Sequence, residues 1–179
     1  FLNATGTRAV FLDERSVPTF FNPVNDQALE IPEFQGPPQQ VLWDAADPNI
    51  FVIANGTDYQ VYTYASTTIN GPMIEAVGTH PQAPGAHPIM MLHGVVAFQL
   101  PGGKMQNELL STHAALRETH VSGERGRERF VRALNMNRLQ DAWEVAAHAQ
   151  IPEMWEQLAH RAMTHMEIEF AIRVYRFVG

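Results

Sequence analysis

The chain has 179 residues, no cysteine and a formal net charge of −7 at pH 7. The lack of cysteine excludes disulfides, thiolate metal sites and a thiol nucleophile, and no apolar run of about 18 residues is present that could span a membrane. The acidic balance argues against a general nucleic-acid surface. Because the sequence starts at Phe1 rather than at an initiator methionine, we expect it to be an internal piece of a longer protein.

Composition divides the chain close to Gly102. Residues 1–103 carry two arginines against nine acidic residues, whereas residues 104–179 carry ten residues of each sign. Prolines concentrate in the first part and helix-forming residues in the second. We therefore predict two architectures that meet near Gly102–Lys104. The acidic first part is compatible with a basic partner, although a solvated β surface is the simpler interpretation.

Short β-branched and aromatic segments, separated by clusters of turn-forming residues, fill the first part. Strands joined by tight turns are predicted to pair antiparallel, as in a sandwich, a barrel or a propeller. Turn clusters are predicted at Asp13–Ser16 and Asn22–Asp26, and a long Pro/Gly loop is predicted from Gly78 to Pro88. The predicted strands are residues 8–12, 17–21, 28–31, 40–43, 50–54, 60–64, 74–77, 89–92, 95–100 and 104–110.

Groups of these strands recur about every 40 residues, which is the spacing of four-stranded propeller blades. About 100 residues supply only two to three such blades, too few to close a ring. We therefore interpret residues 1–110 as the C-terminal blades of an all-β propeller. The recurring strand groups are centred on Val41, Phe51 and Val61, and then on Met90, Ala97 and Met105.

The second part is predicted to be helical. Ser111 or Thr112 is predicted to cap a helix that ends near Glu118. A break follows at Val121–Gly123, and the next predicted helix covers residues 124–135. Asn137 is predicted to cap a further helix over residues 139–149, in which Ala142, Ala146 and Ala149 recur at helical spacing.

The closing stretch is predicted to form two antiparallel helices with a tight turn near His165–Met166. Pro152 marks the start of the first helix, because its fixed φ suits the first helical position. Gly179 can end the second helix in a left-handed conformation. Glu169 and Arg173 are four residues apart and are predicted to form an ion pair on the solvent side.

Small residues on the apolar faces of this hairpin would allow its helices to approach closely. Their order matches the tetratricopeptide pattern, although any helical hairpin with alanines at its crossing would look similar. The alanines of residues 139–149 resemble part of a preceding, degenerate repeat. We therefore interpret residues 111–179 as the start of a tetratricopeptide-like α-solenoid. The residues predicted to pack the repeat are Trp155, Leu158, Ala159, Ala162, Ala171 and Tyr175.

Motifs for catalysis, cofactors or metals are not found in the sequence. The chain has eight histidines, but His160 and His165 are five residues apart and have no third ligand at a useful spacing. Ser111–His113 lacks the Gly-x-Ser-x-Gly elbow of a hydrolase. Gly102–Lys104 lacks the spacing of a phosphate-binding loop. We therefore predict no catalytic, cofactor-binding or metal-binding residue and no enzyme activity.

Several stretches of the sequence resemble those of one known family. The most specific stretch is His165–Arg176, where the solenoid is predicted to begin. Further similar stretches are Pro23–Asp26, Glu30–Pro32, Val41–Trp43, Val61–Tyr64, Leu110–His113 and Asp141–Glu144. The family that these stretches resemble is the intraflagellar transport protein 144 family, also called the WD repeat-containing protein 19 family.

This resemblance implies two N-terminal seven-bladed propellers followed by a long tetratricopeptide-like solenoid. Residues 1–110 would end the second WD40 propeller, and residues 111–179 would begin the solenoid. It also implies a non-enzymatic core subunit of the intraflagellar transport A complex that acts in retrograde ciliary transport, ciliary entry of membrane proteins and cilium assembly. Its partners would be the other subunits of that complex, with peripheral association with membrane cargo through the complex. Its location would be the cilium or flagellum, the basal body and the cytoplasm.

Two other functions remain open from the sequence. A vesicle-coat or nuclear-pore scaffold would have the same order of propeller and solenoid. A hydrolase with its site in the propeller mouth would need polar groups that converge at one end of the strands, and the sequence offers no such set.

Overall fold

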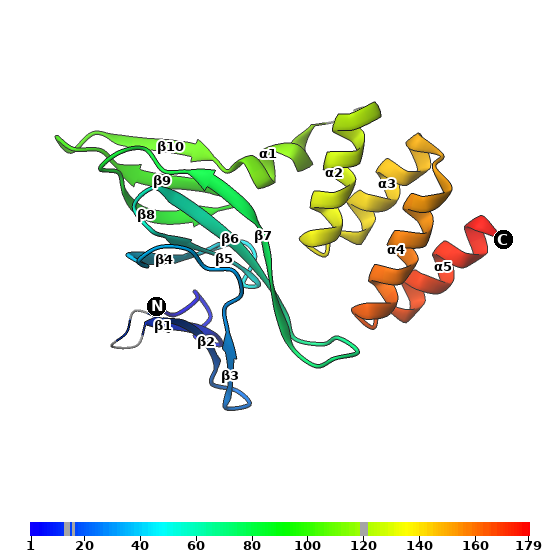
Figure 1. The fold of residues 1–179 in the computed structure, drawn as a ribbon, viewed down its shortest axis with the longest axis horizontal. Coiled ribbons are helices and arrows are strands. Elements are labelled where there is room, and N and C mark those ends of the chain that lie inside the picture. Colours follow the sequence, from blue (N-terminus) through cyan, green and yellow to red (C-terminus); the bar gives the residue numbers. More distant parts are fainter. Residues whose placement is uncertain (13–14, 16, 119–121) are drawn as a thin grey trace. The chain divides into compact units, whose positions relative to one another are not determined.

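The computed structural model describes residues 1–12, 15, 17–118 and 122–179, and in them strands precede helices (Figure 1). The chain forms two compact units. The first contains Phe1–Tyr64 and Ile74–His113, and the second contains Ala65–Met73 and Ala114–Gly179. The prediction of antiparallel strands followed by helices is therefore confirmed.

Three antiparallel sheets make up the first unit, and each strand pairs with its neighbours in sequence. The middle sheet has four strands, the size of a propeller blade. The first sheet contains β1 (Ala9–Leu12), β2 (Pro18–Asn22) and β3 (Gln27–Glu30); the second contains β4 (Gln40–Trp43), β5 (Ile50–Ala54), β6 (Asp58–Ala65) and β7 (Met73–Pro81); the third contains β8 (His87–Leu92), β9 (Val95–Gln99) and β10 (Met105–Leu109).

The inner strands of the middle sheet, β5 and β6, are buried on both faces. All five residues of β5 are buried, which explains why its sequence is a continuous apolar run rather than an alternation. Toward the first sheet, aromatic rings fill the core: Phe20 stacks on Tyr64 with ring centroids 4.4 Å apart, and Phe51 stacks on Tyr62 at 5.4 Å. Such pairs contribute about 0.5–1.5 kcal/mol each beyond the burial of their area.

The third sheet joins the second through its first strand. A parallel bridge between Asp44 and Met91 connects the end of β4 with β8. Val96 and Phe98 of β9 are buried on one face of this sheet, together with Met91. On the other face Leu92 is 44% exposed, and Met90 is exposed as well. In the described residues, this sheet is therefore covered on one face only.

The helices of the second unit form two hairpins of equal length. The first helices of the two hairpins start 29 positions apart, at Gly123 and Pro152, and so do the second helices, at Leu139 and Ile168. After a short helix, α1 (Ser111–Arg117), they are α2 (Gly123–Asn135) paired with α3 (Leu139–Ala149), and α4 (Pro152–Thr164) paired with α5 (Ile168–Val178).

Backbone geometry repeats at the same spacing. Asn137 and Met166 are both left-handed, with φ of 53° and 57°. Just after them, the N–H of Arg138 donates to Ala133 O, and the N–H of Glu167 donates to Ala162 O, both at 2.8 Å. The two hairpins are thus copies of one backbone unit. Within the same compact unit, the N–H of Ile69 donates to Thr164 O at 2.9 Å.

The structure corrects three details of the sequence interpretation. Asn137 does not cap α3: it occupies a left-handed turn, which asparagine tolerates, and Arg138 is the N-terminal cap residue. The loop predicted from Gly78 is shorter, because β7 continues to Pro81. Arg173 does not pair with Glu169 but donates to Gln140 Oε1 at 2.6 Å. Parts of the predicted turn at residues 13–16 and of the break at residue 121 lie outside the described residues.

Candidate functional site

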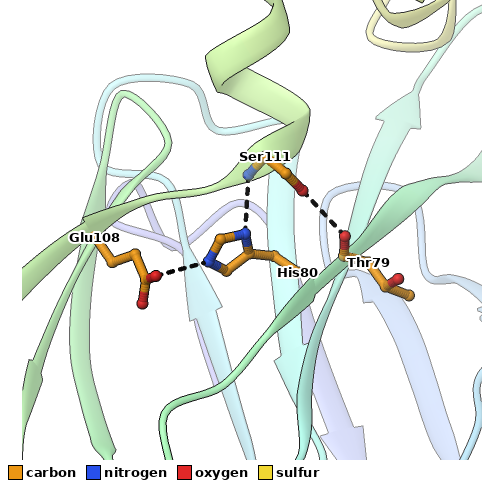
Figure 2. A network of polar contacts seen from close by, with 4 residues as sticks. All are labelled: Thr79, His80, Glu108 and Ser111. Carbon is orange, nitrogen blue, oxygen red and sulfur yellow. Dashed lines mark hydrogen bonds and ion pairs between the residues drawn. The ribbon is translucent and has the colours of Figure 1, made fainter.

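His80 of β7 lies at the centre of a polar network that joins three elements (Figure 2). Its Nδ1 accepts the backbone N–H of Ser111, the first residue of α1, at 3.0 Å, and its Nε2 lies 3.3 Å from Glu108 Oε1 on β10. The Ser111 hydroxyl donates to Thr79 O at 3.2 Å. Because Nδ1 accepts a backbone N–H, the proton of the neutral imidazole is on Nε2, facing the carboxylate.

This network contains the residue types of a Ser-His-Glu triad without its geometry. A nucleophilic serine must donate its hydroxyl proton to the imidazole, whereas the Ser111 hydroxyl donates to a backbone carbonyl. The imidazole instead connects the outer strand of the middle sheet to β10 and to the start of α1. Its role in this geometry is structural.

Tyr59 of β6 packs against this network. Its ring is fully buried and stacks on the His80 ring with centroids 6.4 Å apart. Burial, and secondarily the negative charge of Glu108, raises the pKa of Tyr59 to about 12. The phenol is therefore neutral at physiological pH, and its hydroxyl has no hydrogen-bond partner among the described residues.

The sequence interpretation missed this network, because it placed His80 in the Pro/Gly loop predicted from Gly78 to Pro88. The available signal was weak: Ser111 or Thr112 was predicted to cap a helix, and the first N–H groups of a helix need acceptors. A histidine from a strand 31 positions earlier supplies one of these acceptors.

Asp44 forms a second buried polar connection, at the end of β4. Its Oδ1 accepts the backbone N–H groups of Ala46 and His93 at 2.8 and 3.0 Å, and its Oδ2 accepts that of Gly94 at 2.7 Å. The β8–β9 turn is thereby fixed to the neighbouring sheet by a carboxylate with three backbone donors.

In the helical hairpin, five of the six residues predicted to pack the repeat are buried: Trp155, Leu158, Ala159, Ala162 and Ala171. Tyr175 differs, since its side chain is 60% exposed. Val174, one position earlier, is the buried residue of α5 beside Ala171.

Trp143 of α3 is a packing residue that the sequence interpretation did not single out. Its ring lies 4.8 Å from the ring of Trp155 and 5.1 Å from that of Phe177. The Arg173 guanidinium lies over Trp143, 4.5 Å from its centroid, and over Phe170 at 4.6 Å. Such cation–π contacts stabilise by about 0.5–1 kcal/mol at exposed sites, so this cluster joins α3 to the second hairpin.

Residues 1–12, 15, 17–118 and 122–179 contain no candidate metal centre and no candidate membrane span. In these residues no three histidine, aspartate or glutamate side chains are grouped so that they could hold a metal ion. No helix in the same residues is both long and apolar enough to cross a membrane.

Comparison with known proteins defines the class of protein to which the sheets belong. A family model described as the WDR19 second β-propeller matches residues 1–113, which contain all three sheets, so these sheets are those of a WD-repeat propeller. The chain belongs to the WD repeat-containing protein 19 family, as the resemblance predicted.

Relatives match over the whole chain. It is 35% identical over 183 residues to WD repeat-containing protein 19 of Homo sapiens and 34% identical over 187 residues to that of Mus musculus. It is 22% identical over 187 residues to WD repeat-containing protein dyf-2 of Caenorhabditis elegans. All of this chain is covered in each case, but only 14%, 14% and 13% of these relatives. The chain thus spans about one seventh of their length.

Proposed function

We propose that this chain is a scaffold segment of a non-enzymatic subunit of the intraflagellar transport A complex. The subunit would act in retrograde ciliary transport, in ciliary entry of membrane proteins and in cilium assembly. One observation carries this proposal: a chain of the WD repeat-containing protein 19 family places stacked propeller sheets before repeated helical hairpins. Such surfaces of stacked repeats suit the holding of partners.

Residues 1–110 are proposed as the C-terminal blades of a second WD40 propeller. The four-stranded middle sheet and the burial of its inner strand β5 on both faces support this assignment. The exposed apolar face of the third sheet supports it too, because in a closed propeller each blade packs against another on either side.

Residues 111–179 are proposed as the start of a tetratricopeptide-like solenoid, packed through Trp155, Leu158, Ala159, Ala162, Ala171 and Tyr175. The repetition of hairpin lengths, left-handed turns and hydrogen bonds supports a stack of equivalent units. Its period of 29 positions is shorter than the 34 residues of a tetratricopeptide repeat. In such a stack the exposed Tyr175 would contact the following unit.

The proposed partners are the other subunits of the complex, and the proposed locations are the cilium, the basal body and the cytoplasm. The test is to tag the full-length protein at its own locus in ciliated cells, to purify it and to image it. We expect co-purification with the other complex A subunits and signal in the cilium and at the basal body. Recovery as a stable monomer from these cells would refute the proposal.

The same experiment separates the alternative of a vesicle-coat or nuclear-pore scaffold. Signal at the Golgi or the nuclear envelope, with coat or pore proteins in the purified material, would favour that alternative. The tag expressed alone controls for both the imaging and the purification.

A further inference from the structure

A polar hollow of about 420 Å³ lies in the first unit, beside the segment that follows β3. Glu33 and Gln35 line it from this segment, and Asn55, Asp58 and Gln60 line it from the β5–β6 turn and from β6. Its volume falls within the range of about 300–1,000 Å³ that is usual for ligand sites.

Two amide side chains, of which Gln60 is buried, hold the wall that carries Glu33. Gln60 is only 6% exposed; its Oε1 accepts the N–H of Gln35 at 3.1 Å and its Nε2 donates to Gln35 O at 2.7 Å. Asn55 Nδ2 donates to the same carbonyl at 3.0 Å, and the Tyr62 hydroxyl donates to Gln60 Oε1 at 3.2 Å. The segment next to Glu33 is therefore fixed on β6 rather than free to move away.

The charged side chains that line the hollow are all acidic. Glu33 and Asp58 are the charged residues that line it, and no cation is among its lining residues. Burial, and secondarily the charge of Glu33, raises the pKa of the Tyr62 phenol at the back of the hollow. Among the described residues the Glu33 carboxylate has no ion pair or hydrogen bond, and the Asp58 carboxylate accepts only the Thr57 hydroxyl, at 2.8 Å.

We infer that this hollow binds an arginine or lysine side chain of a protein partner. A guanidinium or ammonium group has several donors and no acceptor, and the two carboxylates of the hollow supply acceptors for it. A metal ion fits less well, because no third carboxylate or histidine joins this pair among the described residues. The acidic excess of residues 1–103 would attract a basic segment over a longer range.

This inference deepens the proposed scaffold role, because it names the group that one contact of the scaffold would bind. The two can fail separately. A chain whose hollow binds no basic side chain could still assemble through other surfaces, and a basic segment could bind here in a different assembly.

The test compares isosteric, charge-removing variants of the full-length protein. The double variant Glu33→Gln/Asp58→Asn removes both charges of the hollow. The control Asp26→Asn/Glu30→Gln removes the same charge from exposed positions that do not line it. The probe is a fluorescein-labelled peptide with two arginines in a glycine–alanine background, and its counterpart carries neutral citrulline at both positions. Fluorescence anisotropy measures both peptides at physiological ionic strength.

We expect the arginine peptide to bind the wild type and the control variant alike, and the hollow variant about three- to tenfold more weakly. The citrulline peptide should bind all three equally weakly. An equal loss of affinity in the hollow variant and the control variant would mean that net charge alone attracts the peptide, and it would overturn the inference. An unchanged affinity of the hollow variant would also overturn it, and so would equal binding of the two peptides to the wild type. If the double variant melts at a lower temperature, Glu33→Gln alone carries the test, because this side chain is exposed.

Discussion

At the scale of single residues, the first unit depends on buried or partly buried polar side chains that bond to backbone groups outside their own strand. Asp44 accepts three backbone N–H groups, Gln60 bonds to both backbone atoms of Gln35, and His80 accepts the first N–H of α1. A buried donor left without an acceptor costs about 1–3 kcal/mol. These residues therefore determine where turns and loops lie, which apolar burial alone does not specify.

Gly94 should be intolerant of any side chain. Its φ is +74°, and a Cβ there would lie 2.1 Å from Cγ of the buried His113. We expect Gly94→Ala to destabilise the first unit by roughly 2–4 kcal/mol, the sum of left-handed strain and displacement of the imidazole. Thermal unfolding of the full-length protein measures this. Gly102→Ala is the control, since its φ is +94° but its Cβ would meet no atom within 4 Å. Equal effects of both changes would show that the His113 contact is unimportant.

The raised pKa of Tyr59 predicts that the stability of the protein depends on pH. Its pKa is raised from 10.0 to about 12, so the folded state holds the phenol proton more tightly than the unfolded state. The stability linked to this proton is fully present below pH 10 and is lost as the pH rises from 10 to 12. We expect Tyr59→Phe to remove this part of the alkaline loss. At pH 7 the substitution should leave the free energy of unfolding unchanged, because the Tyr59 hydroxyl has no hydrogen-bond partner among the described residues that could be lost. Urea unfolding at several pH values tests this, with the exposed Tyr175→Phe as the control.

At the scale of elements, the sequence alone predicted the bounds of two strands that are buried along most of their length. β4 and β5 were predicted with their observed bounds, because both are apolar runs between turn-forming residues. β7 was predicted too short, because Gly78 signals a turn and, among Gly78, Thr79 and His80, only Thr79 favours a strand. Their conformation depends on pairing and on the contacts of His80 with distant residues.

The repetition of the hairpins was only partly visible in the sequence. The backbone turn recurs at Asn137 and Met166, but the two side chains are unrelated. On the packed face, the bulky Phe130 of α2 corresponds to Ala159 of α4 at the 29-position spacing, and both are buried. Similar backbones are thus packed with different side-chain volumes, and comparison of residue types alone does not reveal them. The polar hollow was equally hidden, because it combines residues from 33 to 79.

The crossing of α4 and α5 should not accept a large side chain. Ala162 is fully buried, and we expect Ala162→Trp to force the two helices apart at a cost of about 1–3 kcal/mol or more. Hydrogen exchange of the α4 and α5 amides measures the local loss of stability. Met163→Trp adds a ring at the next, exposed position and should have little effect. If both variants exchange like the wild type, the helices do not cross at Ala162.

At the scale of the whole molecule, the first unit presents apolar faces at both ends of its three sheets. Phe11 of the first sheet is 44% exposed, and Leu92 and Met90 of the third sheet are exposed as well. Monomeric proteins rarely leave contiguous apolar faces open to water. If residues 1–110 are the last blades of a larger propeller, as proposed above, further blades would cover both faces.

Residues 1–113 alone should therefore self-associate. We expect sedimentation velocity to show concentration-dependent oligomers of this fragment, because its open sheet faces and strand edges bind one another. Met90→Glu/Leu92→Glu places charges on one of these faces and should lower the association. A monodisperse monomer for the unmodified fragment would contradict this expectation.

The equal hairpins of the second unit have a consequence for insertions and deletions. Because α2 and α4 start 29 positions apart and the turns repeat with them, removal of one whole period from Gly123 onward would bring Pro152 to the same place in the chain. The helix lengths and the left-handed turn would then be preserved. A deletion of half a period would instead join a first helix directly to another first helix and reverse the chain direction. Insertions or deletions of one whole hairpin in this region should therefore preserve the fold, whereas insertions or deletions of part of a hairpin should disrupt it.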